Sequence, residues 1–218
     1  MPPLILGLLV ANVLVFVLQQ VLGNAFTGWF ALWPLGSGLF MPWQVISYAF
    51  LHGGLMHIGF NMFGLWMFGS ELERVWGARR LAVFYTASVL MAAAAQLTVT
   101  AALGSNAPTI GASGGLFGLL LGFAMVFPQR KIIPLLPPIP MPAWLFVTLY
   151  GLIELTLGVT GTANGIAHFA HLGGLLGGWL VIRYWRGQLP FWRGRRSRAG
   201  RVAERPAPAP RHAEGLKT

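Results

Sequence analysis

The segment GASGGLFGLLLGFAMVF, residues 111–127, decides how this chain folds. It begins with a turn of small residues and continues as an apolar run without a charged side chain. Gly114, Gly118 and Gly122 recur every fourth residue, which places them on one face of a helix. A face of small residues lets helix backbones approach closely in lipid. We therefore predict a short transmembrane helix that begins near Ser113 and packs closely against its neighbours.

The composition of the whole chain indicates that lipid surrounds most of it. Of the 218 residues, 56% are hydrophobic and 9% are charged, whereas about a quarter are charged in a typical soluble domain. The absence of cysteine excludes disulfides and cysteine-ligated metals. Aspartate is also absent, which excludes a Ser-His-Asp triad. A hydrolase built from this sequence must use a Ser-His pair or recruit one of its five glutamates.

Six segments are candidates for membrane spans, for which roughly 20 mostly apolar residues are needed. They are residues 4–22, 44–69, 81–103, 113–127, 143–157 and 166–185. No basic residue precedes the first span and no small-residue cleavage site follows it, so we interpret it as a retained helix rather than a signal peptide. We predict an all-α, polytopic membrane protein with a six-transmembrane-helix bundle at residues 1–185. Residues 186–218, rich in Arg, Pro and Ala, are predicted to form a disordered cytoplasmic tail.

The positions of the basic residues predict the topology. Ten of the 15 lie from Arg183 onward, and the others lie in two predicted loops, 70–80 and 128–142, at Arg74, Arg79, Arg80, Arg130 and Lys131. The loops on the opposite side contain no Lys or Arg. By the positive-inside rule both termini are cytoplasmic, which requires an even number of spans. We interpret the basic tail as a topology signal and solvated extension; binding of lipid or nucleic acid is the alternative.

Three clusters of polar residues occur within the apolar segments, where polar groups are costly and often functional. Ser113 at a helix start is either an N-cap or a nucleophile at the positive end of the helix dipole. His168 and His171 either hydrogen-bond between helices or supply a general base for Ser113. His57 and Asn61 lie one helical turn apart, on one face, and are either structural polar contacts or donors to a developing negative charge.

These motifs resemble those of the rhomboid family of intramembrane serine proteases. The resemblance rests on GASG at 111–114, AHLGG at 170–174 and HxxxN at 57–61, and it covers about residues 4–185. The segments WQVISYAFLH at 43–52 and ELERVWG at 71–77 are also similar to family sequences. Many members carry Trp-Arg where this chain has Trp43-Gln44.

The resemblance implies a role for several residues of this chain. Ser113 is the nucleophile and His171 its base, in a Ser-His dyad. The oxyanion and substrate-binding group consists of His57, Asn61, Gly111 and Ala112, with the backbone N–H of Ser113. Supporting roles fall to Phe117, which stacks on the histidine, to Gly174 and to His52. We interpret His168 as a packing residue and assign Glu154, the acid within a predicted span, no role.

The expected function is that of an intramembrane serine endopeptidase, which cleaves transmembrane segments of other membrane proteins. The expected partners are such substrates and the lipid bilayer, without nucleic acid, metal or organic cofactor. The six-span core and the lack of cysteine favour a bacterial inner membrane. The main alternative is a rhomboid-like pseudoenzyme that binds transmembrane clients without cleaving them. A transporter or channel would require an ionisable pathway through the bilayer, for which few residues are available. The sequence does not identify the substrate, the cleavage-site preference or the oligomeric state.

Overall fold

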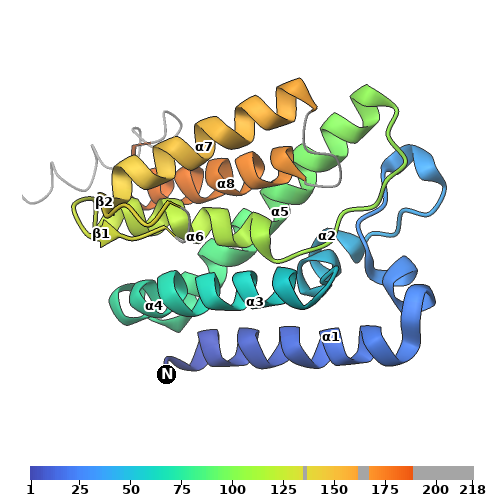
Figure 1. The fold of residues 1–218 in the computed structure, drawn as a ribbon, viewed down its shortest axis with the longest axis horizontal. Helices are drawn as coiled ribbons and strands as arrows, with labels where there is room; N and C mark the ends of the chain where they lie inside the picture. The colour runs from blue at the N-terminus through green and yellow to red at the C-terminus, as the bar shows by residue number, and fades with distance from the viewer. Residues whose placement is uncertain (135–136, 162–166, 189–218) are drawn as a thin grey trace, which may run out of the picture. The chain divides into compact units, whose positions relative to one another are not determined.

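The structure is a computed structural model that describes residues 1–134, 137–161 and 167–188 (Figure 1). Its helices are α1 (Pro3–Phe30), α2 (Gln44–Ser47), α3 (Leu55–Gly64), α4 (Ser70–Trp76), α5 (Ala78–Leu103), α6 (Ser113–Val126), α7 (Ala143–Thr160) and α8 (His168–Trp185). Two 3₁₀ turns lie at Leu35–Ser37 and Tyr48–Phe50, and the π-helical turn η3 lies at Leu65–Gly69. Strands β1 (Lys131–Ile132) and β2 (Met141–Pro142) form an antiparallel pair between α6 and α7. Among the described residues the chain is therefore mostly helical.

Helix α6 runs between the other helices of the bundle, with α3 on one side and α7 and α8 on the other in Figure 1. Its glycines permit this central position, because a side chain would collide with a neighbouring helix. A β-carbon built on Gly115 would lie 2.5 Å from the ring of Tyr85 in α5, and one on Gly122 would lie 2.9 Å from the ring of Phe84. A β-carbon on Gly118 would overlap Ser88, also in α5. The prediction that the glycine face of this segment packs closely is confirmed.

Helix α8 approaches two helices through two glycine pairs. Gly174 and Gly178 face the backbone of α6, whereas Gly173 and Gly177 face the backbone of α5. A β-carbon at Gly177 would lie 3.0 Å from the carbonyl oxygen of Ala87. Helices α5, α6 and α8 thus meet with their backbones almost in contact, which fixes their relative positions.

The predicted second span, 44–69, is not one helix. The chain forms α2, a 3₁₀ turn and the non-helical residues 51–54 before α3 begins at Leu55. The prediction of a loop over residues 70–80 is also wrong, because Ser70–Trp76 is helical and Gly77, with φ +76°, separates it from α5. Glu73 lies buried in α4, and its carboxylate oxygens accept hydrogen bonds of 2.9 Å each from the backbone N–H groups of Leu4 and Ile5. Glu73 thereby satisfies two of the free donors at the start of α1 and ties α4 to that helix.

Helix α1 continues beyond the predicted end of the first span at residue 22. It kinks at Gly23, whose φ of +68° and ψ of −153° are not helical, and ends at Phe30. The loop that follows is organised by Gln44, which is 1% exposed. Its side-chain oxygen accepts the N–H groups of Trp33 and Met41 at 3.2 Å, and its nitrogen donates to the carbonyls of Trp29 at 3.3 Å and Leu39 at 3.2 Å. Glutamine therefore maintains a hydrogen-bonded loop at this position.

Three helices in the described part of the chain, α1, α5 and α7, are long and apolar enough to cross a membrane, and α6 is a shorter apolar helix. Large apolar side chains on α1 and α7 point away from the bundle: Leu6, Val10, Val13, Leu14, Val17, Val21, Trp144, Leu152, Ile153 and Val159. Contiguous apolar surface of this kind is stable only in lipid or against another protein. With several such helices the chain is an integral, multi-pass membrane protein.

Candidate active site

Ser113 and His171 form the centre of the candidate site. Ser113 is the first residue of α6, and its Oγ lies 2.8 Å from Nε2 of His171 in α8. The two side chains come together because the backbones of α6 and α8 are almost in contact. The closeness is shown at Gly174, where a β-carbon would overlap the carbonyl of Gly114. Two helices that approach this closely place side chains 58 residues apart in sequence within hydrogen-bond distance.

The ring of His171 has a fixed orientation. Phe117, one turn after Ser113, stacks on it with ring centroids 4.3 Å apart and an interplanar angle of 6°. His171 is buried, whereas Ser113 is half-buried. A hydroxyl hydrogen-bonded to an oriented imidazole is the arrangement by which enzymes activate a serine nucleophile.

His57 in α3 presents a donor near the serine. Its Nδ1 accepts a hydrogen bond of 3.2 Å from the backbone N–H of Gly53. A neutral imidazole carries its proton on one nitrogen only, so Nε2 of His57 carries it here. A β-carbon built on Gly111, whose φ is +125°, would lie 2.8 Å from this Nε2 and 3.6 Å from Ser113 Oγ. Glycine thus leaves open a space that both groups border, as an oxyanion site requires.

The other predicted residues surround this pair. Asn61 is buried, and its side-chain nitrogen donates a 2.9 Å hydrogen bond to the carbonyl of His57; among the described residues it makes no hydrogen bond with Ser113 or His171. His52 is buried edge-on against His57, with ring centroids 5.0 Å apart. Ala112 is fully buried directly before α6. Asn61 and His52 therefore contact His57 rather than the Ser-His pair.

A family model described as the rhomboid domain matches residues 39–187 of the chain. The match covers more than half of the sequence and includes all the residues of the candidate site. The chain belongs to the rhomboid family. The family confirms the resemblance inferred from the sequence motifs and implies a polytopic helical bundle in a membrane.

Relatives of this rhomboid are similar over much of the chain. It is 29% identical over 188 residues to the rhomboid protease GlpG of Serratia proteamaculans, covering 84% of this chain and 62% of that protein. It is 30% identical over 189 residues to the rhomboid protease GlpG of Yersinia pestis, with the same two shares. It is 33% identical over 153 residues to the mitochondrial rhomboid protein 1 of Saccharomyces cerevisiae, covering 64% of this chain and 42% of that protein. The alignments thus span less than two thirds of the length of these relatives.

Sequence reasoning missed one residue of the site. Glu154 in α7 is 9% exposed, and its Oε2 lies 2.6 Å from Nδ1 of His168 and 2.9 Å from Nδ1 of His171. His168 is therefore more than the packing residue that we expected. An ionisable residue inside a membrane segment is a functional candidate by default, and this signal could have identified Glu154.

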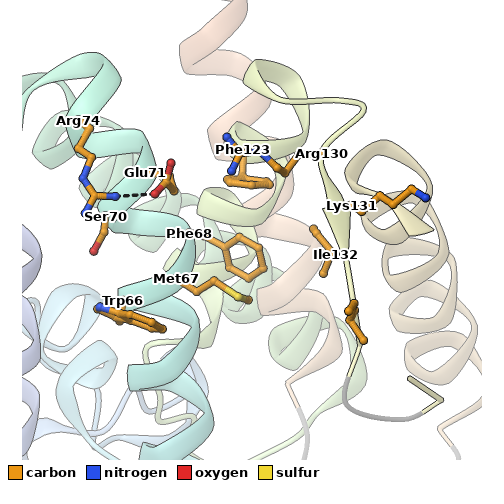
Figure 2. Close-up of a pocket in the computed structure, with 11 residues that line it drawn as sticks. Trp66, Met67, Phe68, Ser70, Glu71, Arg74, Phe123, Arg130, Lys131 and Ile132 are labelled. Carbon is orange, nitrogen blue, oxygen red and sulfur yellow. Dashed lines mark hydrogen bonds and ion pairs between the residues drawn. The ribbon is translucent and has the colours of Figure 1, made fainter. Parts of the chain in front are cut away.

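Two cavities differ in their relation to the site. A cavity of about 330 Å³ borders the candidate oxyanion residue His57 and is also lined by Gly53, Gln96, Pro108 and Ala167. A second, of about 390 Å³, lies between α4 with η3 and the β1 side of the chain (Figure 2). It contains the Glu71–Arg74 ion pair and is lined by neither Ser113 nor His171. The first cavity therefore borders a residue of the candidate site, His57, whereas the second does not.

Proposed function

We propose that this rhomboid is an intramembrane serine endopeptidase that cleaves transmembrane segments of other membrane proteins with a Ser113–His171 pair. The main observation in support of this proposal is the 2.8 Å hydrogen bond between Ser113 Oγ and His171 Nε2, within a bundle of apolar helices. Family membership and the relatives named rhomboid protease support the same reaction. Ser113 is half-buried rather than enclosed, and the proposed oxyanion donor His57 lines a cavity.

The proposed reaction is acyl transfer to serine and then to water. Ser113 Oγ attacks the scissile carbonyl while His171 Nε2 accepts its proton. The tetrahedral oxyanion is stabilised by Nε2–H of His57 and the backbone N–H of Ser113, in the space next to Gly111 and Ala112. Asn61 donates one amide hydrogen to the carbonyl of His57 and supplies its second amide hydrogen to the oxyanion in this proposal. His171 then gives the proton to the leaving amine, and water hydrolyses the acyl-enzyme by the same steps in reverse. No step needs a metal or an organic cofactor.

The proposed arrangement in the bilayer has six spans with both termini cytoplasmic, in a bacterial inner membrane. Residues 1–185 form the membrane domain in this proposal. Residues 186–218 are the basic cytoplasmic tail, which lies outside the described residues from 189 onward. The family resemblance suggests that a substrate helix enters beside α7 and unwinds locally, because its peptide bonds are otherwise shielded by their own hydrogen bonds. Apolar side chains exposed on α7 are consistent with this route.

The test is cleavage by the purified protein in proteoliposomes that contain a transmembrane model substrate. Wild type, Ser113→Ala and His171→Ala are compared, together with labelling by a fluorophosphonate probe. We expect cleavage and labelling in the wild type only. Equal cleavage by all three proteins would contradict the proposal. Folded wild-type protein that neither cleaves nor reacts with the probe would instead favour the client-binding pseudoenzyme.

A further inference from the structure

We propose that Glu154 is a positioning residue that extends the Ser113–His171 pair into a Ser-His-Glu triad, with His168 holding its carboxylate in place. This inference rests on the proposed function, because it assigns a role within the same reaction. It also gives a role to an acid in a chain that has no aspartate.

The carboxylate lies at the second nitrogen of the base. Glu154 Oε2 is 2.9 Å from Nδ1 of His171, on the opposite side of the imidazole from Ser113. The contact has ion-pair distance without hydrogen-bond alignment, and the buried Nδ1 has no hydrogen-bond partner among the described residues. The 2.9 Å distance is already that of a hydrogen bond, so only the alignment of the two groups is missing.

An acceptor at this place favours the chemistry of His171. To take the Ser113 proton, Nε2 must be unprotonated, so the neutral ring must carry its proton on Nδ1. A buried N–H without an acceptor is unfavourable, and the ring would adopt the other tautomer or turn. After proton transfer the imidazolium is a buried cation, which a neighbouring carboxylate stabilises. Glu154 meets both requirements with one side chain.

His168 explains why Glu154 stays in position. Its Nδ1 lies 2.6 Å from the same Oε2, and its ring is perpendicular to that of His171. Helix α7 is close to α8 here, because a β-carbon on Gly158, one turn after Glu154, would lie 3.2 Å from the Phe169 ring. The carboxylate is therefore held between two imidazoles by helix packing and by a short hydrogen bond.

A metal ion is the competing interpretation of two histidines and a glutamate. Their possible ligand atoms lie within 4.8 Å of one another. Ligands at about 2.0–2.1 Å from a tetrahedral Zn²⁺ are separated by roughly 3.3 Å. The 2.6 Å between Glu154 Oε2 and His168 Nδ1 is too short for that geometry and fits a hydrogen bond. We therefore favour proton-mediated contacts.

The kinetic test compares Glu154→Gln with Glu71→Gln, an acid of α4 that pairs with Arg74 far along the chain from the site. Glutamine keeps the shape of the side chain and removes its charge. In proteoliposomes we expect Glu154→Gln to lower kcat on the order of 10²-fold, with KM within about twofold of wild type, and Glu71→Gln to leave both unchanged. A kcat of Glu154→Gln within about twofold of wild type would overturn the proposal. So would loss of wild-type activity in EDTA, in favour of a metal site.

A second pair of variants, at His168, tests the proposal independently if Glu154→Gln does not fold. His168→Asn retains an N–H near the position of Nδ1, whereas His168→Ala removes it. We expect His168→Asn to keep most of the wild-type kcat and His168→Ala to lose it, at equal thermal stability. Equal kcat values for the two variants would contradict the role of the short hydrogen bond.

The nitrogen of His171 that carries the proton can be determined without substrate turnover. In protein with ¹⁵N-labelled imidazoles, we expect NMR to show His171 protonated at Nδ1 in the wild type and at Nε2 in Glu154→Gln. The same tautomer in both proteins would overturn the proposal. Since this readout needs no substrate, it tests Glu154 even if the wild type does not cleave and the proposed function fails.

Discussion

The imidazole of His171 lies flat against the ring of Phe117, at 4.3 Å between centroids and 6° between planes. Both residues belong to helices that meet through glycine, Phe117 on α6 and His171 on α8. The stack restricts the orientation of the histidine ring, whose Nε2 lies 2.8 Å from Ser113 Oγ and whose Nδ1 lies 2.9 Å from Glu154 Oε2.

Replacing Phe117 by leucine should slow the reaction more than it destabilises the protein. Aromatic stacking contributes about 0.5–1.5 kcal/mol beyond burial, which corresponds to a kcat about twofold to tenfold lower if it orients the base. Phe123→Leu is the control, because Phe123 is a buried aromatic of the same helix that packs on Phe68. Proteoliposome kinetics and thermal unfolding of both variants test this. Equal kcat values for the two variants would show that the stack does not matter for catalysis.

Alanine at Gly111 should abolish most cleavage. Its β-carbon would occupy the space between His57 Nε2 and Ser113 Oγ, and loss of an oxyanion donor costs about 10²–10³-fold in kcat. Gly104→Ala is the matched control, since Gly104 also has a positive φ, of +65°, but a β-carbon there meets nothing within 4 Å. Both variants carry backbone strain, so only the difference in kcat reports on the site. Similar kcat values would argue against an oxyanion site beside Gly111.

Alanine at Gly174 should separate α6 from α8. The new methyl group overlaps the backbone of Gly114, and overpacking typically costs about 1–3 kcal/mol. We expect a lower thermal midpoint and loss of fluorophosphonate labelling, because Ser113 and His171 move apart. Gly7→Ala in α1, where a β-carbon meets nothing within 4 Å, should change neither measurement. Full labelling of Gly174→Ala would mean that the bundle adjusts without moving the pair.

Replacing Gln44 by leucine should loosen the loop after α1. The N–H groups of Trp33 and Met41 and the carbonyl of Leu39 lose their partner, whereas the carbonyl of Trp29 keeps its bond from Nε1 of Trp43. Removing one partner of a hydrogen bond is unfavourable to the extent that the remaining group is buried. Limited proteolysis in detergent should therefore cut residues 31–43 faster than in the wild type. Gln20→Leu, an exposed position on α1, serves as the control and should be cut at the wild-type rate. Unchanged proteolysis of Gln44→Leu would indicate that other contacts, such as the Trp29–Trp43 stack and the bond from Trp33 Nε1 to the Gly28 carbonyl, hold the loop.

The sequence predicts the parts of the site that depend on short motifs. Ser113 at the start of α6 follows from a turn of small residues before an apolar run, and the face of Gly114, Gly118 and Gly122 predicts that α6 packs closely against its neighbours. The role of Glu154 was not predictable in this way. It depends on how α7 packs on α8, and residues 162–166 between them lie outside the described residues.

The break in the second predicted span also escapes sequence reasoning. Residues 44–69 contain no charged side chain apart from histidine, so hydropathy alone does not mark the non-helical residues 51–54. In Ser70–Trp76 the helix makes a tertiary contact, the bond of Glu73 to the start of α1, which no local pattern shows. Likewise, glutamine at position 44, where many family members carry arginine, suggests from the sequence that hydrogen bonds in this loop are lost. In the structure the amide of Gln44 has four hydrogen-bond partners.

The close approach of Gly114 and Gly174 means that main-chain atoms, common to every amino acid, set the spacing of the reacting pair. Side chains elsewhere on the helices can then change through evolution as long as they stay apolar and fill similar space. Such freedom to drift fits the 29–33% identity between this rhomboid and its relatives. It also makes the glycines, rather than the larger residues around them, the positions at which a random mutation is least tolerated.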